Sequence, residues 1–523
     1  MKNIIKVFGI SSLLVLGSCS DDFITKTPYT QQVEENFYKT PSDALKGLVA
    51  AYDILQREGY GGWLMNTEIA SDNCYGGFGT ADSNVDVERD RFQFISDKEM
   101  NNPIWENDYI GIYRANVLLQ NLDNIDWGTD TALKTQYEAE AKFLRAFYHF
   151  RLARVFGDIV PLDHTLSSSE FETPRASAEV TYKLIAEDFK FAADNLGNQN
   201  YSTPGNDNYG RVTKWAAEAF LAKAFLFYTD YYNKADLAGV VSKSEAITYI
   251  NDVVNNSGHN LVSNFSSLWL ASSASESATY AGEGNTEAVF AIRYNGSGNA
   301  NWNLHDGNRF KVNISTRGGN YGVYGQGWGG GTVTASLYNA YGAGDVRRDA
   351  TIIDYAGEAL GYDAEANGQR QYTGYGWKKG ARVTGEQGSG DFQIDNTEDI
   401  YLMRFSDVLL MAAELNLDSN ASFAQACLDR VRNRAYGVTD NSHSVPATLA
   451  NILNERRLEL ALEGDRWFDL IRQSMDVTAA AVNATSLGGE FAVTFRPETQ
   501  GWFALPQSQV LISNGSITQN PGW

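Results

Sequence analysis

The chain has 523 residues, of which 43% are hydrophobic, and a formal net charge of −22. Acidic residues outnumber basic ones by 64 to 42, which argues strongly against nucleic acid or an anionic lipid surface as the main partner, because both need clustered Lys and Arg. The length suffices for a large core. The 28 Tyr, 26 Phe and 11 Trp, together with 48 Gly, predict a helical body that carries a loop-rich, aromatic surface.

The N-terminus has the pattern of a signal peptide. Lys2 and Lys6 flank the start of an apolar run at residues 7–16, which is too short to span a bilayer as a stable helix and suits a signal-peptide core. We therefore predict a signal peptide over residues 1–18. No other stretch approaches the length of uncharged apolar residues that a membrane span needs.

The apolar run ends in the sequence LGSC at 16–19, which resembles the bacterial lipoprotein processing box. This resemblance implies that Cys19 becomes the lipidated first residue, so that the protein is anchored to a membrane without crossing it. The sequence SDD at 20–22 resembles the acidic signal by which Bacteroidetes-type lipoproteins reach the cell surface; an ordinary flexible tether is the alternative. We predict a lipidated N-terminus and tether over 19–40.

Residues 41–256 have the pattern of a helical scaffold. Thr40 and Pro41 mark a helix start, with proline near the first position. Further helices are predicted at the periodic segments 103–122, 132–156, 177–196 and 212–232. Small and aromatic residues alternate on their faces, so that small residues on one helix admit large ones from the next, as in tetratricopeptide-like helix pairs. The sequence does not show a regular repeat of tetratricopeptide length.

Between 257 and 397 the sequence becomes rich in Gly, Asn, Ser and Tyr, with few long apolar runs. Residues 287–293 (EAVFAIR) alternate like a short strand, and most of the rest has the pattern of loops and hairpins. Because loops on a rigid scaffold usually carry binding residues, this region is where we expect function.

Familiar catalytic and cofactor motifs are missing. The sequence has no HExxH, GxSxG or Walker motif. Residues 325–330 match GxGxxG, but no βαβ pattern surrounds them and Trp328 would crowd a pyrophosphate, so a dinucleotide site is not predicted. Because the chain has 64 acidic residues, some pairs of carboxylates that could cleave a glycosidic bond are expected by chance. Nothing in the sequence singles out one pair. We expect no cofactor and no catalytic residue.

Asp82, Asn84 and Asp86 have the alternate spacing with which a loop wraps calcium. Val87 stands where such a loop requires glycine, and Gln93 stands where it requires a bidentate glutamate. We therefore favour a solvated acidic loop over a calcium site and predict no metal site.

Two apolar helices are predicted near the C-terminus, at 401–416 and 449–472. The second interleaves charged residues with its apolar stripe. Charges on a buried helix persist only when they are paired and hydrogen-bonded, so we favour a structural ion-pair network over a catalytic cluster. Cys74 and Cys427 are expected to be free thiols, with one bridge between them as the lesser alternative.

Several aromatic residues lie in loops where no apolar periodicity explains them. Trp302 lies in the run NANWN, and Tyr321, Tyr324 and Trp328 lie among glycines. A flat ring with small neighbours offers its face to the C–H side of a pyranose, while Asn, Asp or Arg nearby can bind the hydroxyls. The alternative is that each ring folds onto the core as a loop plug.

Segments spread over nearly the whole chain resemble, in the same order, segments of the SusD/RagB family of outer-membrane lipoproteins. These segments are the lipoprotein box and residues 140–161, 210–228, 401–416, 427–434, 449–472 and 505–523. The resemblance implies a mainly α, SusD-like fold. In it, tetratricopeptide-like helix pairs at 41–256 would support a loop-rich glycan-binding region at 257–397, and C-terminal helices at 398–523 would close the same domain.

By the same resemblance, the protein would bind an oligosaccharide or polysaccharide fragment at the cell surface. It would deliver this glycan to a SusC-like TonB-dependent transporter in the outer membrane, held there by the lipid on Cys19, without cleaving it. One alternative is a lid that captures a peptide or glycopeptide for such a transporter. A surface glycoside hydrolase is the less favoured alternative.

The resemblance also indicates glycan-binding residues. Trp328 matches an aromatic residue that often stacks on sugar, and Asp72 matches an acid that often binds a sugar hydroxyl. Tyr75 and Phe78 are close to Asp72 in sequence and could complete a platform, and Trp302 is the next candidate. With Tyr324 from the glycine-rich run, these residues form the predicted glycan site, whereas Trp63 and Trp377 are interpreted as core or rim.

Overall fold

The protein is described here from a computed structural model, which covers residues 37–59, 62–93, 99–199, 208–296, 301–302, 306–386 and 391–523. The predicted signal peptide, Cys19 and most of the predicted tether lie outside these residues. Within the described ranges, no helix is both long enough and apolar enough to cross a membrane.

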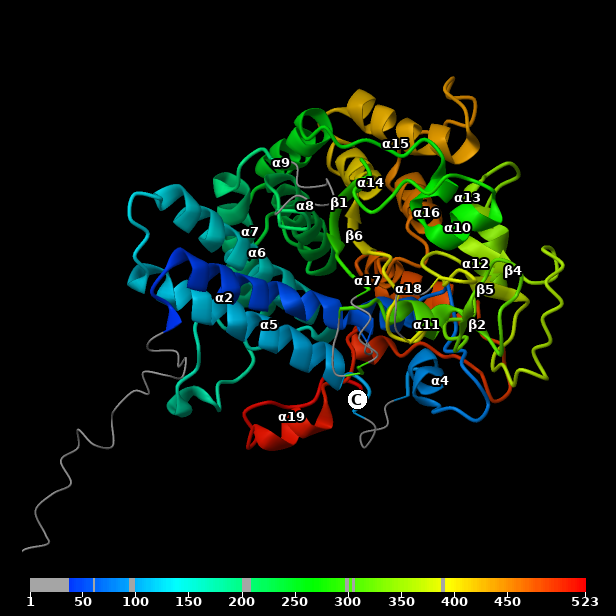
Figure 1. The fold of residues 1–523 in the computed structure, drawn as a ribbon, viewed down its shortest axis with the longest axis horizontal. Coiled ribbons are helices and arrows are strands. Elements are labelled where there is room, and N and C mark those ends of the chain that lie inside the picture. The colour runs from blue at the N-terminus through cyan, green and yellow to red at the C-terminus, as the bar shows by residue number, and fades with distance from the viewer. Residues whose placement is uncertain are drawn as a thin grey trace, which may run out of the picture.

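One half of the molecule is a stack of long helices, drawn from blue to green in Figure 1. They are α2 (Pro41–Asp53), α5 (Asn102–Asn121), α6 (Thr131–Phe156), α7 (Ala178–Asn195), α8 (Lys214–Tyr231) and α9 (Lys243–Asn256). Thr40 begins α2 in a capping box with Asp43, as the predicted helix start requires. Consecutive helices pack on each other from α5 to α9. The helices predicted over this half of the chain are confirmed.

Small residues on one helix admit aromatic rings from the next. A side chain at Gly111 of α5 would overlap the Tyr148 ring of α6. Phe143 and Phe147 of α6 meet Phe220 of α8 edge to face, with ring centroids 5.6 and 5.3 Å apart. The alternation of small and aromatic residues in the sequence is therefore the means by which these helices interlock.

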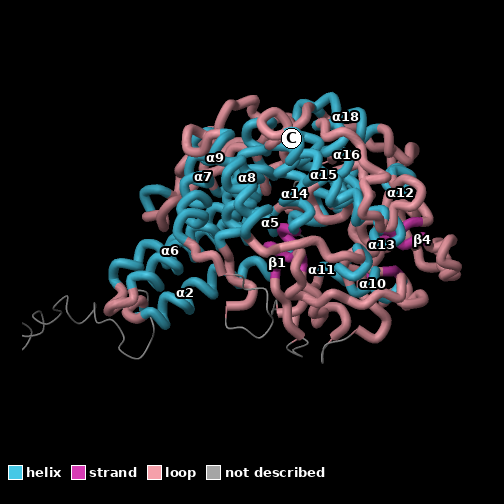
Figure 2. Tube along the Cα trace, turned by 90° about the horizontal axis from the view of Figure 1, so that it is seen from above, coloured by secondary structure: helices cyan, strands magenta, loops and turns pink. Residues whose placement is uncertain are grey.

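The other half consists of short elements joined by long loops, as Figure 2 shows around α10 to α13 and β4. The short elements are α3 (Trp63–Ala70), α4 (Val85–Asp90), α10 (Leu270–Ser275), β1 (Ala288–Ile292), α11 (Phe310–Ile314), β2 (Thr316–Arg317), β3 (Gln326–Gly327), α12 (Ala335–Ala340), α13 (Arg347–Thr351), β4 (Ile352–Asp354) and β5 (Tyr375–Trp377). Strand β2 pairs with β3 in parallel, and β4 pairs with β5 antiparallel. Strand β1 confirms the strand predicted at 287–293.

The C-terminal part returns to helices. Its elements are β6 (Ile400–Arg404), α14 (Phe405–Leu415), α15 (Ala421–Tyr436), α16 (Leu449–Glu459), α17 (Arg466–Ile471), α18 (Met475–Asn483) and α19 (Gln507–Ile512). Of these, α14 contacts α8 and α9 of the helical half, and α17 contacts α3 of the other half. The prediction of one helix over 401–416 was wrong at its start, because residues up to Arg404 form a strand. Ile400 pairs with Ile292 in an antiparallel ladder with β1, and a short buried apolar run does not by itself distinguish strand from helix.

The helix predicted over 449–472 is broken in two. Helix α16 ends at Glu459 and α17 begins at Arg466. Between them Leu462 and Gly464 have φ values of 65° and 89°, in the left-handed region that no right-handed helix can contain. A Cβ at Gly464 would lie 2.6 Å from the Trp63 ring, so this turn requires glycine for both its backbone conformation and its packing.

The charged residues of this segment form a buried ion-pair network, as predicted. Glu459 accepts from Arg404 at 2.9 Å, from Arg434 at 2.5 Å and from Arg347 at 3.1 Å, and all four side chains are buried. The arginines come from β6, α15 and α13. Because a buried charge is tolerated only with partners, this cluster joins the loop-rich half to the C-terminal helices.

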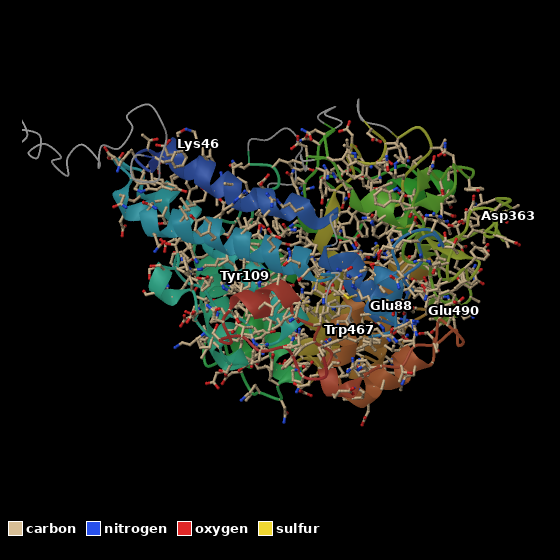
Figure 3. The ribbon with its side chains drawn as sticks, turned by 90° about the horizontal axis from the view of Figure 1, so that it is seen from below. Lys46, Glu88, Tyr109, Asp363, Trp467 and Glu490 are labelled. Carbon is tan, nitrogen blue, oxygen red and sulfur yellow. The ribbon has the colours of Figure 1, made fainter. Side chains whose placement is uncertain are left out.

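The core is continuous through the middle of the molecule. Trp467 of α17 lies near the centre of the view in Figure 3 and is buried, as are Trp63 and Trp377. Cys74 and Cys427 are buried free thiols, which confirms the expected absence of a bridge between them. Burial raises the pKa of both thiols, that of Cys427 to about 12, so neither is activated as a nucleophile.

Candidate functional site

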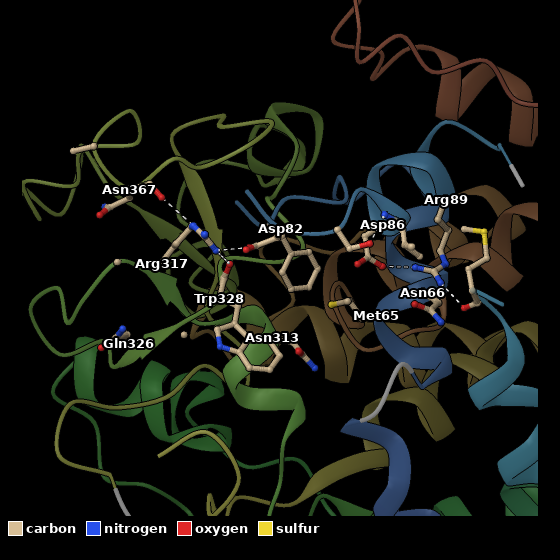
Figure 4. Close-up of a pocket in the computed structure, with 17 residues that line it drawn as sticks. Met65, Asn66, Asp82, Asp86, Arg89, Asn313, Arg317, Gln326, Trp328 and Asn367 are labelled. Atoms are coloured by element: carbon tan, nitrogen blue, oxygen red, sulfur yellow. Dashed lines mark hydrogen bonds and ion pairs between the residues drawn. The ribbon is translucent and has the colours of Figure 1, made fainter. Parts of the chain in front are cut away.

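A pocket of about 920 Å³ opens between parts of the chain that are far apart in the sequence. One wall comes from α3, α4 and the loop between them, and the other from residues 313–328 and 366–367. Figure 4 shows Trp328 on one side of the pocket and Asp86 and Arg89 on the other. The volume is in the upper part of the range of ligand pockets, which is sufficient for several linked sugar rings or a short peptide.

Backbone hydrogen bonds bring the two aromatic residues of the pocket together. The loop at 74–78 pairs antiparallel with the glycine-rich loop at 329–333. The amide of Phe78 donates to the carbonyl oxygen of Gly329 at 2.8 Å. Phe78 therefore lies next to the residue that follows Trp328, and both side chains line the pocket.

The glycines of the GxGxxG run are required by packing. The amides of residues 328–330 donate to carbonyl oxygens of the 312–315 segment at 2.7–2.9 Å, so they are not available to hold a phosphate. Gly329 has a φ of 73°, and a Cβ at Gly330 would lie 2.6 Å from the Phe78 ring. This geometry agrees with the prediction that the run is not a dinucleotide site.

Trp302 stacks on Trp328 from a neighbouring loop. The two indole rings are parallel to within 3°, and their centroids are 6.3 Å apart. Arg309 donates to the carbonyl oxygen of Trp302 at 2.7 Å, and its guanidinium lies 5.3 Å from the Trp302 ring. Two van der Waals contacts need about 7–8 Å, so a sugar ring does not fit between the two indoles. A ligand would meet the remaining surfaces of this ring pair.

The charged side chains that line the pocket are paired with each other. Arg317 donates to the carboxylate of Asp82 at 2.6 Å, and Arg89 forms an ion pair with Asp86. Asp82 and Asp86 are two of the residues whose spacing resembles that of a calcium-binding loop. In the structure their carboxylates face guanidinium groups. The pocket thus presents a balanced charge to a ligand.

Amide side chains supply most of the remaining polarity. Asn66, Asn313, Gln326 and Asn367 line the pocket together with the aromatic rings. The Asn367 amide donates to the hydroxyl of Tyr321 at 2.6 Å. Amides both donate and accept, which suits ligands with many hydroxyl groups.

Asp72 is not in the pocket, so the prediction that it binds a sugar hydroxyl is corrected. Its side chain is buried, with both carboxylate oxygens bound by Arg466 at 2.6 and 2.9 Å and one also paired with Arg457 at 3.0 Å. Burial by itself would raise the pKa of Asp72, but the hydrogen bond and charge of Arg466 and the charge of Arg457 outweigh it, and the pKa lies below its ordinary value.

Tyr75 and Tyr324 are also buried outside the pocket, which corrects their assignment to the platform. The Tyr75 hydroxyl donates to the carbonyl oxygen of Thr485 at 2.6 Å. The Tyr324 hydroxyl donates to the carboxylate of Glu358 at 2.5 Å. For Tyr324 the loop-plug alternative describes the structure. The structure brings three of the predicted residues together, namely Phe78, Trp302 and Trp328.

Asn66, Asn313, Arg317 and Asn367 line the pocket although their sequence context does not mark them as binding residues. Asn66 lies inside a buried apolar helix, and Asn313 and Arg317 follow Phe310 in a short mixed segment without periodicity. Only Asn367 lies among residue types that are typical of turns. Its position in a loop is therefore a signal in the sequence for a binding residue. The other three carry no local signal, because their place in the pocket depends on how distant segments pack.

Comparison with known proteins gives matches over both halves of the chain. A family model described as "SusD family" matches residues 286–523, and one described as "Starch-binding associating with outer membrane" matches residues 22–226. A relative from Formosa agariphila, SusD-like protein P2, is 26% identical over 99% of both chains. A SusD-like protein from Bacteroides ovatus is 26% identical over 90% of this chain and 82% of its own.

Solved structures share the fold. A laminarin-binding SusD-like protein is 27% identical, with a TM-score of 0.77 over 93% of this chain and all of its own. Surface glycan-binding protein A from Bacteroides fluxus is 25% identical, with a TM-score of 0.78 over the same shares. The mainly α architecture of this chain is therefore the one seen in glycan-binding SusD-like proteins.

Proposed function

This chain is a member of the SusD family, and on that premise we propose that it binds a neutral oligosaccharide or polysaccharide fragment in the pocket between Phe78 and Trp328. It binds the glycan without cleaving it and delivers it to a SusC-like TonB-dependent transporter. The protein acts at the outer membrane, held by a lipid on Cys19. The family description "associating with outer membrane" and the Bacteroides and Formosa relatives support this location.

The observation that carries the proposal is the aromatic pair at the pocket. Phe78 and Trp328 are held by the pairing of two loops, so their rings are positioned before a ligand arrives. A pyranose has one face of C–H groups that packs on a ring and a rim of hydroxyls that bonds to amides. Asn313 and Asn367 supply such amides along the same pocket.

The charge of the pocket supports a neutral ligand. Asp82 and Asp86 each pair with an arginine that lines the same pocket. A carboxylate or phosphate on the ligand would have to compete with these existing ion pairs, whereas hydroxyl groups would not. One structural neighbour is named for binding laminarin, which makes this neutral glucan the first ligand to test.

Binding without turnover agrees with the same geometry. Glycoside hydrolysis needs two carboxyl groups that face the scissile bond, one of them protonated. The carboxylates that line this pocket are both engaged by guanidinium groups, at Arg317 and Arg89. Neither is placed as a proton donor to a sugar oxygen.

Affinity electrophoresis tests the proposal. The form that starts after Cys19 is run through gels containing laminarin, amylopectin, xylan or a bacterial capsular polysaccharide, beside Trp328→Ala. We expect one glycan to retard the wild type, the variant to migrate freely, and no reducing ends to be released. If no glycan retards the wild type while a peptide library binds, the capture of peptides replaces this proposal.

A further inference from the structure

Four tyrosines form a stacked cluster at the rim of the loop-rich half. Tyr355 and Tyr362 stack with ring centroids 4.2 Å apart, and Tyr362 and Tyr372 stack at 5.6 Å, both pairs with 27° between their planes. Tyr321 meets Tyr362 edge to face at 4.9 Å. Tyr355 is a buried core residue, whereas 39% of Tyr372 is exposed, so the stack runs from the core to the surface.

This tyrosine cluster is joined to the pocket by two side-chain amides. Asn367, which lines the pocket, donates to the hydroxyl of Tyr321 at 2.6 Å. The hydroxyl of Tyr362 donates to Gln369 at 3.0 Å, and the Gln369 amide donates to the carbonyl oxygens of Phe78 and Gly329 at 3.1 and 2.9 Å. The cluster therefore rests on the same backbone pairing that holds the pocket rings.

The wall between the pocket and the cluster is continuous. The amide of Arg370 donates to the carbonyl oxygen of Phe78 at 2.9 Å, and the amide of Thr80 donates to that of Gly368 at 2.8 Å. Arg317 also donates to the carbonyl oxygen of Asn367 at 2.9 Å, close to its ion pair with Asp82. The backbone that carries Phe78 is thus hydrogen-bonded to the segment that leads to Tyr372.

The exposed end of the stack has the properties of a sugar-binding surface. Single exposed aromatic residues are common and need no explanation. Tyr372 differs because its ring is already held by Tyr362, so little side-chain freedom is lost when a ligand packs on it. Asp363, in the turn beside the cluster, would repel an anionic chain and leave a neutral one unaffected.

We propose that the tyrosine cluster is an outer binding surface, on which a neutral polysaccharide that occupies the pocket continues toward Tyr372. The protein then distinguishes long chains from short ones, because only a long chain reaches both surfaces. Two linked binding events raise the affinity above that of the pocket alone. This inference rests on the proposed glycan function of the pocket.

Titration calorimetry with two ligands tests the inference. The probes are laminarin and the shortest laminarin oligosaccharide that binds measurably, or the matching pair from whichever glycan retards the wild type. Tyr372→Ala should weaken binding of the polysaccharide by about fivefold and leave the oligosaccharide unchanged. Tyr372→Phe keeps the ring and should bind both as the wild type does.

The matched control is Tyr113→Ala, which removes a more exposed tyrosine from α5 in the helical half. It should bind both probes normally. If Tyr372→Ala binds the polysaccharide normally while Trp328→Ala does not, the outer surface is refuted and the pocket proposal stands. Equal losses for both probes would also refute it, because the ring would then only support the pocket. If the wild type binds no glycan, both proposals fail together.

Discussion

Arg466 binds both carboxylate oxygens of Asp72, with its Nε 2.6 Å from Oδ1 and its second terminal nitrogen 2.9 Å from Oδ2. The pair joins the end of α3 to the start of α17, and Arg457 of α16 adds a further contact at 3.0 Å. Bidentate pairs of this kind fix orientation as well as charge. Asp72 therefore holds the loop that leads to Phe78 against the C-terminal helices.

We expect Asp72→Ala to destabilise the fold. Its removal leaves two largely buried guanidinium groups without this partner, which typically costs about 3–5 kcal/mol. Urea unfolding measures the loss. Asp123→Ala is the control, because Asp123 is 90% exposed in its pair with Lys134 and should contribute less than about 1 kcal/mol. Normal stability of Asp72→Ala together with lost glycan binding would instead return Asp72 to the binding site.

The lowered pKa of Asp72 predicts how the free energy of unfolding depends on pH. The pKa of Asp72 is lower in the folded protein than in the unfolded chain, so its contribution is present above the unfolded pKa and is lost as the pH falls through the folded one. Unfolding free energies measured downward from pH 5 should therefore decline less steeply in Asp72→Ala than in the wild type.

Trp302 is predicted to assist binding without being essential. Its ring stacks on Trp328 but is not part of the pocket wall, so Trp302→Ala should weaken glycan binding by up to about tenfold, whereas Trp328→Ala should abolish it. Calorimetry with the glycan that retards the wild type measures both. Phe171→Ala, which removes an exposed ring from the helical half, is the control. Tighter binding by Trp302→Ala would show that its ring obstructs the site.

The raised pKa of Asp90 predicts that the fold loses stability as the pH rises toward neutral. Burial raises the pKa of Asp90 to about 8, although Gln371 donates to its carboxyl at 2.6 Å. The folded protein thus binds a proton that the unfolded chain releases near pH 4, and stability falls as the pH rises from about 4 to about 8. Asp90→Asn keeps the shape of the group and should flatten this decline by up to a few kcal/mol.

Urea unfolding at a series of pH values measures this effect. Burial also raises the pKa of Glu68, to about 7, so part of the slope should remain in Asp90→Asn. An unchanged slope in the variant would show that Asp90 is ionised in the fold. Gln371 also accepts from the amide of Gly77, next to Phe78, so the same variant tests whether this contact affects glycan binding.

Much of the helical half could be predicted from the sequence. Helix α6 is recognisable because its hydrogen bonds and its repeating face are properties of neighbouring residues. The prediction was wrong where distant partners decide the outcome. Residues 400–404 form a strand because β1 is available to pair with them. The predicted 449–472 helix is interrupted between Glu459 and Arg466, where Trp63 and Glu68 of α3 pack against Gly464.

In the candidate site, too, some features follow from the local sequence and others from contacts between distant residues. The sequence alone determined the acidic character, the order of the helices and the presence of rings in glycine-rich loops, because these follow from composition and local spacing. Only the tertiary structure decided that Phe78 and Trp328 share a pocket and that Asp72 and Tyr324 are buried. The exposure of a side chain depends on what packs over it, and for Asp72 that partner, Arg466, is 394 positions away.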